Sequence, residues 1–238
     1  MAETDGRAIK EGDFAEIDFI GRVKGTGEIF DLTVEDAAKK ESIYRSDAIY
    51  KPAFVIIGTG MMLESLERIL TGMKEGEEKT IDIEAKDAFG PRDASKIRIL
   101  PYSAFAKNEV MPAAGMFLEV DGKRCKVQSA GSGRVRADFN HPLAGKDVSY
   151  WVKVRRIIDR PEDKASAYLQ YLGIDSTPAF SDGKLSIATK IRLDDKLKEF
   201  FDGQLRKHMQ EVKEIAFSEE KQEGEQKFKD GKTEGNQQ

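Results

Sequence analysis

The sequence EIDFIGRV at residues 16–23, followed by KGTG at 24–27 and EIFD at 28–31, decides the fold. Ile17, Phe19 and Gly21 lie two positions apart, so they share one face of an extended strand. The glycine-containing turn at 25–27 then leads into a second short apolar run at Ile29 and Phe30. This pattern predicts a β-hairpin.

Two helices and two more strands are predicted around this hairpin. Thr33, with Asp36 three residues later, is a capping signature for a helix over 34–40, which opens an insertion that ends near Pro52. A second helix is predicted before Gly72, because Met62, Leu66, Ile69 and Leu70 fall on one helical stripe. Alternating residues predict strands at 81–83 and 148–154, the second with Val148, Tyr150, Val152 and Val154 on one face.

Residues 94–138 have the pattern of a small separate sheet. Met116, Leu118 and Val120 alternate with other residues before the tight turn Asp121-Gly122, and Cys125 and Val127 begin the return strand. Asp-Gly between alternating segments is a strong hairpin signal. A second turn at 131–133 and the alternation of Val135, Ala137 and Phe139 complete the predicted sheet.

After Asp159 the pattern changes to helices around a strand. Pro161 at a first helical position and Gly173 at the stop delimit a helix, and Leu185, Ile187 and Thr189 predict a strand. A long amphipathic helix is expected over 197–215, with an apolar stripe formed by Leu197, Phe200, Phe201, Leu205, Val212 and Ile215. Residues 218–238 hold one large apolar residue, Phe228, and are expected to form a disordered polar tail.

Composition excludes several classes of function. The 238-residue chain has a net charge of −4 with interspersed signs, which argues against a dedicated binder of nucleic acid or membrane surfaces. One cysteine and two distant histidines leave no disulfide framework and no typical metal or Ser-His-Asp site, so no metal and no cofactor are expected. The polar N-terminus has no apolar signal core, and a cytoplasmic protein is expected. Gly58-Thr59-Gly60 lacks the lysine and hydroxyl of a phosphate loop, so a tight turn before a helix is the better interpretation.

Several segments, in order, carry a family resemblance. Residues 16–23, 27–31, 54–58 and 63–67 resemble FKBP-type peptidyl-prolyl isomerases, and residues 74–80, 87–90 and 148–154 continue the match. The stretch FNHPLAGKD at 139–147 is similar to the return from the insert-in-flap domain of the SlyD-like branch. Residues 160–217 resemble, more loosely, the extra module of long-type archaeal members.

The resemblance implies a catalytic site free of covalent steps. It places Phe19, Phe30, Phe89 and Tyr150 in the walls of a proline pocket, with Asp31 facing the carbonyl that twists. It places Leu66 at the pocket floor, and Met62 and Leu63 against the bound peptide. Relatives usually have tyrosine at the position of Phe19 and often tryptophan at that of Leu66. Without the resemblance, the aromatic residues are ordinary core residues and Asp31 is a turn residue.

The residues of the insert allow two interpretations. Phe105, Val110, Met111, Met116 and Phe117 form an adaptable chaperone surface for unfolded chains, or they fill the small core of the insert itself. His141, before Pro142, is interpreted as structural.

These observations predict an α+β protein built from an antiparallel FKBP-like sheet on a short helix. The expected domains are a catalytic domain (1–93 and its closing strand 139–159), an insert-in-flap domain (94–138), a C-terminal α+β module (160–217) and the tail. The expected function is proline isomerisation in an apolar aromatic pocket, with chaperone activity towards unfolded or proline-containing clients. The alternatives are a peptide-binding holdase with a vestigial pocket and a purely structural assembly protein. Because a lone strand has open edges, residues 160–217 are expected to dock on the catalytic domain or pair in a homodimer.

Overall fold

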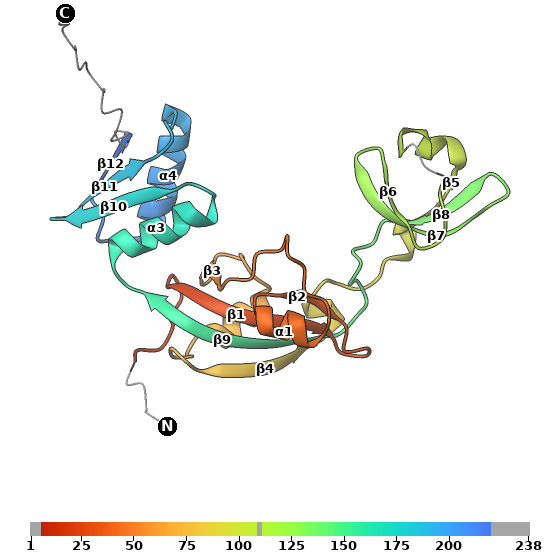
Figure 1. The fold of residues 1–238 in the computed structure, drawn as a ribbon, viewed down its shortest axis with the longest axis horizontal. Coiled ribbons are helices and arrows are strands. Elements are labelled where there is room, and N and C mark those ends of the chain that lie inside the picture. Colours follow the sequence, from red (N-terminus) through yellow and green to blue (C-terminus); the bar gives the residue numbers. More distant parts are fainter. Residues whose placement is uncertain (1–5, 109–110, 220–238) are drawn as a thin grey trace, which may run out of the picture. The chain divides into compact units, whose positions relative to one another are not determined.

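The computed structural model describes residues 6–108 and 111–219, and it divides into two compact units, residues 1–158 and 159–238 (Figure 1). The predicted α+β class is confirmed, because mostly antiparallel sheets combine with a few short helices. Val110 and residues 220–238 of the predicted tail lie outside the described residues. None of the helices in the described ranges is long and apolar enough to cross a membrane.

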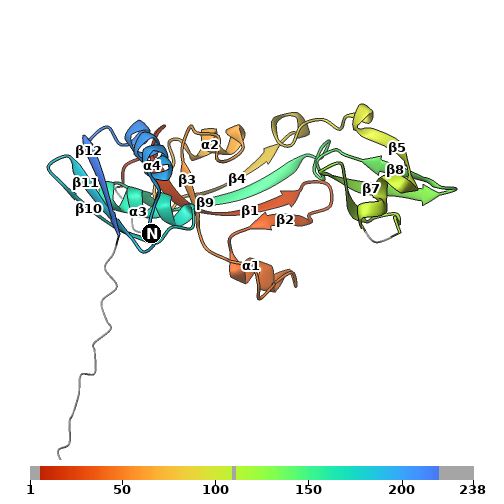
Figure 2. The ribbon, with the colours of Figure 1, turned by 90° about the horizontal axis from the view of Figure 1, so that it is seen from above.

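The first sheet contains five strands: β1 (Phe14–Val23), β2 (Ile29–Leu32), β3 (Ala53–Ile56), β4 (Glu78–Ile83) and β9 (Val148–Ile158). Figure 2 shows β2, β1, β9 and β4 side by side in this order, and β3 pairs with β1. The long central strand β9 pairs antiparallel with both β1 and β4. The predicted hairpin at 16–31 is therefore confirmed, and the strand predicted at 148–154 is the centre of the sheet.

The core of this sheet follows the predicted alternation. Val148, Tyr150, Val152 and Val154 are all buried on one face of β9. Helix α2 (Glu64–Leu70) packs Leu66 and Leu70 into the same cluster. Burial of each such side chain is worth about 1.5–3 kcal/mol, so this face stabilises the whole sheet.

The helix α1 (Glu35–Lys40) forms where predicted, but its capping signature is wrong. Val34 occupies the N-cap without a side-chain cap. The Thr33 hydroxyl instead accepts from the Phe19 N–H (2.9 Å) and donates to the buried Asp18 carboxylate (2.9 Å). Thr33 therefore ties the end of β2 to β1 rather than starting the helix.

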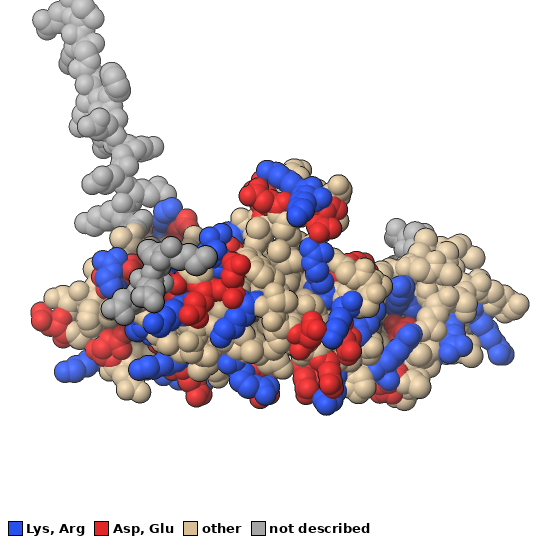
Figure 3. All heavy atoms as spheres, turned by 90° about the horizontal axis from the view of Figure 1, so that it is seen from below, with Lys and Arg blue, Asp and Glu red and all other residues tan. Residues whose placement is uncertain are grey.

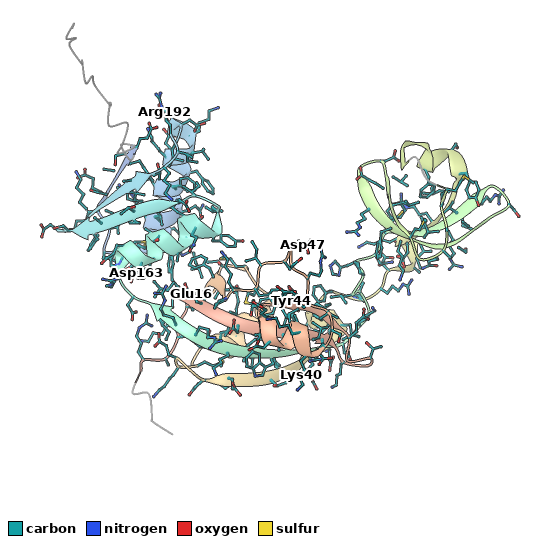
Figure 4. The ribbon with its side chains drawn as sticks, in the orientation of Figure 1. Glu16, Lys40, Tyr44, Asp47, Asp163 and Arg192 are labelled. Atoms are coloured by element: carbon teal, nitrogen blue, oxygen red, sulfur yellow. The ribbon has the colours of Figure 1, made fainter. Side chains whose placement is uncertain are left out.

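An exposed loop follows α1 and contains an aromatic pair. The Tyr44 and Tyr50 rings stack with centroids 5.5 Å apart, and the Tyr50 hydroxyl accepts from the Arg45 N–H. Figure 4 labels Tyr44 and Asp47 on this loop and Lys40 at the end of α1.

The insert forms a second, four-stranded antiparallel sheet. Its strands are β5 (Ile97–Pro101), β6 (Phe117–Val120), β7 (Lys123–Gly131) and β8 (Arg134–Asp138), in the order β5-β8-β7-β6. Short 3-10 helices lie at Ala85–Asp87, Ala94–Lys96 and Tyr102–Asn108. The hairpin predicted at Asp121-Gly122 is confirmed between β6 and β7. This sheet has its own apolar cluster, which includes Leu118, Val127 and Val135.

Polar side chains link the two chain segments that connect the first sheet to the insert. The Asn140 amide accepts from the Asp93 N–H (2.9 Å) and donates to the Asp93 carbonyl (2.8 Å). Burial disfavours the charge of Asp138, but hydrogen bonds from Asn140, Arg92 and Gln128 outweigh it and lower its pKa to about 2. Asp138 thus stays ionised at physiological pH and holds the base of the insert.

The second unit contains α3 (Pro161–Tyr171), β10 (Ser176–Ser181), β11 (Lys184–Thr189), α4 (Asp195–His208) and β12 (Glu214–Glu219). The long helix predicted over 197–215 is wrong in its second half, because α4 ends at His208 and Ile215 lies in β12. The lone strand is also wrong: β11 pairs antiparallel with β10 and parallel with β12. Since both edges of β11 are occupied, the open-edge argument for pairing with another copy does not hold for this strand.

Candidate active site

Three aromatic rings meet at the edge of the first sheet. The Phe30 ring of β2 lies 5.6 Å from Tyr150 of β9 and 5.7 Å from Phe89, at interplanar angles of 82° and 89°. Phe89 follows the short helix Ala85–Asp87. Edge-to-face rings at these distances are an attractive arrangement, so the three side chains form a stable apolar wall.

Gly21 makes this approach of the rings possible. It lies on β1 between its two cross-strand partners, Asp31 of β2 and Tyr150 of β9. A Cβ atom at Gly21 would lie 2.7 Å from the Phe30 ring and 2.9 Å from the Tyr150 ring. The sequence spacing predicts only that Gly21 shares a strand face with Ile17 and Phe19. Its place between the Phe30 and Tyr150 rings follows from the cross-strand register.

Asp31, the only acidic residue of β2, lies beside the three aromatic rings. Asp31, Phe30, Leu63, Phe89 and Tyr150 together line a cleft of about 620 Å³. Burial raises the pKa of the Asp31 carboxyl, and a hydrogen bond from the Leu32 backbone N–H offsets part of this rise. Burial and the nearby Asp31 charge raise the pKa of Tyr150 to about 12, so its hydroxyl stays protonated.

Three other residues predicted for the site do not line this cleft. Leu66 is only 1% exposed and belongs to the core cluster of the sheet. Phe19 is also buried, with its ring 6.1 Å from that of Tyr150. Met62 packs against the same cluster. Phe19 and Leu66 belong to the core cluster that also includes Tyr150, and Phe30, Leu63 and Phe89 pack against that cluster.

Leu63 reaches the cleft because a buried carboxylate organises the turn before it. Glu67 of α2 accepts hydrogen bonds from the backbone N–H groups of Gly58 (3.1 Å), Gly60 (3.3 Å) and Met62 (3.3 Å). Gly58 and Gly60 both have positive φ, which glycine adopts without strain. The predicted tight turn before a helix is present, and Glu67 fixes its shape.

His141, interpreted from the sequence as structural, also lines the cleft. Its ring stacks on Phe89 with centroids 4.7 Å apart and planes 3° apart. The Leu143 N–H donates to the His141 Nδ1 (3.2 Å), which fixes the imidazole in place. The stretch FNHPLAGKD was recognised as the return from the insert, but its contact with Phe89 could not be read from sequence spacing.

Matches to known families cover most of the first unit of the chain. The family model described as FKBP-type peptidyl-prolyl cis-trans isomerase matches residues 5–106, and the model of the FKBP26 IF domain matches residues 98–143. The chain is 36% identical over 149 residues to the short-type peptidyl-prolyl cis-trans isomerase of Methanocaldococcus jannaschii, covering 63% of this chain and 94% of the relative. The chain belongs to the FKBP-type peptidyl-prolyl cis-trans isomerase family.

Two bacterial relatives extend the comparison. The FKBP-type 16 kDa isomerase of Escherichia coli is 30% identical over 132 residues (54% of this chain, 87% of the relative). The SlyD isomerase of Helicobacter pylori is 23% identical over 157 residues (65% of this chain, 76% of the relative). The family resemblance and the isomerase activity are therefore confirmed, whereas membership of a long-type archaeal branch stays a prediction.

In this FKBP-type isomerase, the five residues predicted for a chaperone surface differ in their exposure to solvent. Phe105 is 2% exposed and lies in the core of the insert, so its assignment to the surface is wrong. Met111, Met116 and Phe117 are exposed, at 71%, 42% and 43%. Val110 lies outside the described residues. Phe117 also lines the cleft, together with Lys126.

Proposed function

We propose that the isomerase binds the proline of an X-Pro bond against Phe30, Phe89 and Tyr150, with Asp31 facing the carbonyl that precedes the proline. The observation that carries this proposal is the meeting of three rings, in two edge-to-face pairs, beside a partly exposed carboxylate whose pKa is raised by partial burial. Leu63, at the head of α2, is the proposed peptide contact, and its backbone N–H is the proposed donor to a substrate carbonyl. Phe19, Leu66 and Met62 act by holding these groups in place.

The chemistry requires only that the twisted amide be bound better than the planar one. Amide resonance sets a rotation barrier of about 18–20 kcal/mol, and twisting destroys that resonance. The twisted amide carries less negative charge on its oxygen than the planar form does. The aromatic wall of the cleft, with a carboxylate facing that oxygen, therefore disfavours the planar ground state more than the transition state. Each difference of about 1.4 kcal/mol accelerates the rotation tenfold.

Two substitutions test the cleft. Asp31→Ala and Phe89→Ala should each lower kcat/KM for cis-to-trans isomerisation of a short X-Pro peptide by about tenfold or more. Asp36→Ala is the matched control, since Asp36 is an exposed carboxylate on the neighbouring helix α1. Circular dichroism should give the same fold for all three variants. Wild-type activity in both cleft variants would remove the assignment.

We propose further that the insert holds clients during folding, in the cytoplasm. Exposed Met111, Met116 and Phe117 support this role, because large apolar side chains on a small module mark contact surfaces. The alternative of a holdase with a vestigial pocket predicts a different result. In that case the protein would suppress aggregation of an unfolded client while the Asp31→Ala and Phe89→Ala variants behaved as the wild type in every folding assay.

A further inference from the structure

The insert differs in charge from the rest of the chain. Residues 94–138 contain eight lysine or arginine residues and four aspartate or glutamate residues, whereas the whole chain has a net charge of −4. Figure 3 shows mixed charges over most of the visible face, while basic side chains lie among uncharged surface at the end formed by the insert. A basic module on an acidic protein is an electrostatic feature that the isomerase reaction itself does not need.

Two of these cations flank an exposed aromatic ring. The Arg124 guanidinium lies 4.7 Å and the Lys126 ammonium 5.8 Å from the centroid of the Phe117 ring. Phe117 and Lys126 are cross-strand partners in the β6–β7 hairpin, so the strand register keeps them together. Glu119 is the cross-strand partner of Arg124, but within residues 6–108 and 111–219 no ion pair to an acidic side chain is found for Arg124 or Lys126. Both cations are exposed on the hairpin surface.

These residues line a groove of their own. It has a volume of about 480 Å³, and its lining includes Phe117, Arg124, Lys126, Phe139, His141 and Pro142. We call it the basic groove. Phe117, Lys126, His141 and Pro142 also line the aromatic cleft described above, so the two cavities share a wall. A polypeptide with its X-Pro bond in the cleft can thus extend directly into the basic groove.

We infer that the basic groove binds an acidic segment with apolar side chains that flanks the X-Pro bond in the same polypeptide. This inference rests on the proposed function of the cleft and specifies the kind of client it takes. The acidic side chains pair with Arg124 and Lys126, and an apolar side chain contacts Phe117 and Phe139. A polypeptide is the occupant because the groove shares four lining residues with the proposed peptide-binding cleft and therefore lies beside it.

The test uses the full chain, one short peptide and two series of three longer peptides. The short peptide contains an X-Pro bond, and the three longer peptides of each series carry the same X-Pro core with a flanking six-residue segment that is acidic, neutral or basic but equally apolar. Each flanking segment is placed before the core in one series and after it in another. The rate for each long peptide is divided by the rate of the same enzyme for the short peptide, which isolates the contribution of the flank.

Wild-type protein should prefer the acidic flank over the neutral one by about three- to tenfold at low salt, as expected for a few partly exposed charge pairs. The preference should shrink in 0.5 M salt, where charges are screened within several ångströms. The Arg124→Glu/Lys126→Glu variant should reverse the order of the three peptides. The Arg134→Glu/Arg136→Glu variant changes the insert charge equally, at exposed residues outside the groove lining, and should keep the wild-type order.

The outcomes separate the two proposals. If wild-type protein isomerises the short peptide and treats all three flanks alike, the basic groove is not a client site although the cleft assignment stands. If both charge-reversal variants change the preference equally, the net charge of the insert explains the preference, and the assignment of the basic groove as a binding site is wrong. Tight binding of poly(U) that depends on Arg124 and Lys126 and blocks none of the peptides would identify a nucleic-acid site instead. Inactivity towards the short peptide would contradict the proposed function itself.

Discussion

At the scale of single residues, the absence of a side chain matters as much as any side chain in the cleft. Phe30 and Tyr150 can approach each other because Gly21 leaves the space between their strands empty. The sequence alone identified both rings from the family resemblance. It could not identify Gly21, because the requirement arises from the register that aligns Gly21 with Asp31 and Tyr150.

We therefore expect Gly21→Ala to damage the cleft selectively. The new methyl group must displace the Phe30 or Tyr150 ring, and overpacking of this kind typically costs about 1–3 kcal/mol of stability. Activity towards a short X-Pro peptide should fall by about tenfold or more, while the fold remains. Gly25→Ala is the matched control, since no atom lies within 4 Å of a Cβ placed there. A Gly21→Ala enzyme with unchanged kcat/KM would contradict this role for Gly21.

Asp31 should link activity and stability through pH. Its pKa is raised in the folded state, so the folded protein binds this proton more readily than the unfolded chain does. The Asp31 carboxylate is therefore a destabilising group above its folded pKa, and this effect vanishes below the unfolded pKa. Asp31→Asn should lower activity yet raise Tm at pH 7, with the gain in Tm disappearing near pH 3. The difference in Tm between Asp31→Asn and wild type should be larger at pH 7 than at pH 3. A smaller difference at pH 7 would contradict a raised pKa of Asp31 in the folded protein.

At the scale of elements, the sequence predicted hairpins more reliably than it predicted where a helix ends. Turns at residues 25–27 and 121–122 predicted two hairpins correctly. The stripe through Leu205 continued with Val212 and Ile215 at helical spacing, and neither Gly nor Pro marks the true end of α4 at His208. Spacing alone cannot separate a helix from a helix followed by a strand. β10 was not predicted: its Pro178 lacks a backbone donor, which is uncommon within strands, although Asp182-Gly183 is a hairpin signal.

The insert is expected to be removable as an element. Its apolar cluster is separate from that of the first sheet, and Asn140 and Asp93 hold the two connecting segments together at its base. A chain in which a short loop replaces residues 94–138 should remain folded and keep most of its activity towards short peptides. Its assistance to a proline-limited refolding protein should fall much further, because the client is no longer held near the cleft.

Comparison of the two rates decides this prediction. An equal loss in the peptide assay and the refolding assay would mean that the insert is an integral part of the cleft. Retained refolding activity would mean that the insert does not hold the client.

At the scale of the whole molecule, the second unit has the parts of an independent fold. Leu185 and Ile187 of β11 are fully buried, as are Leu169 of α3 and, nearly so, Leu205 of α4. A chain that ends at Asp159 should therefore stay folded and retain the peptide activity of the full chain. Thermal unfolding followed by circular dichroism checks the fold, and a cis-to-trans assay checks the activity. Loss of the fold on truncation would show that the first unit depends on the second.

Homodimer formation through residues 160–217 stays a prediction, and its physical basis has changed. The open edges now belong to β10 and β12, and Ile191, Leu197 and Phe200 are exposed at 54%, 43% and 50%. Light scattering should give twice the chain mass for the full protein and the monomer mass for the chain ending at Asp159. A monomer in both cases would exclude the dimer.

The central position of β9 has a consequence for the order in which the protein matures during synthesis. All strands of the insert are complete by Asp138, whereas β9 begins at Val148 and ends at Ile158. A nascent chain can therefore close the insert through local contacts while β1 and β4 still lack the strand that joins them. On the ribosome, the insert, which we propose holds clients, would fold before the isomerase sheet is complete. A protease added to stalled chains whose residues 148–158 are still inside the exit tunnel should spare the insert and digest the segments around it.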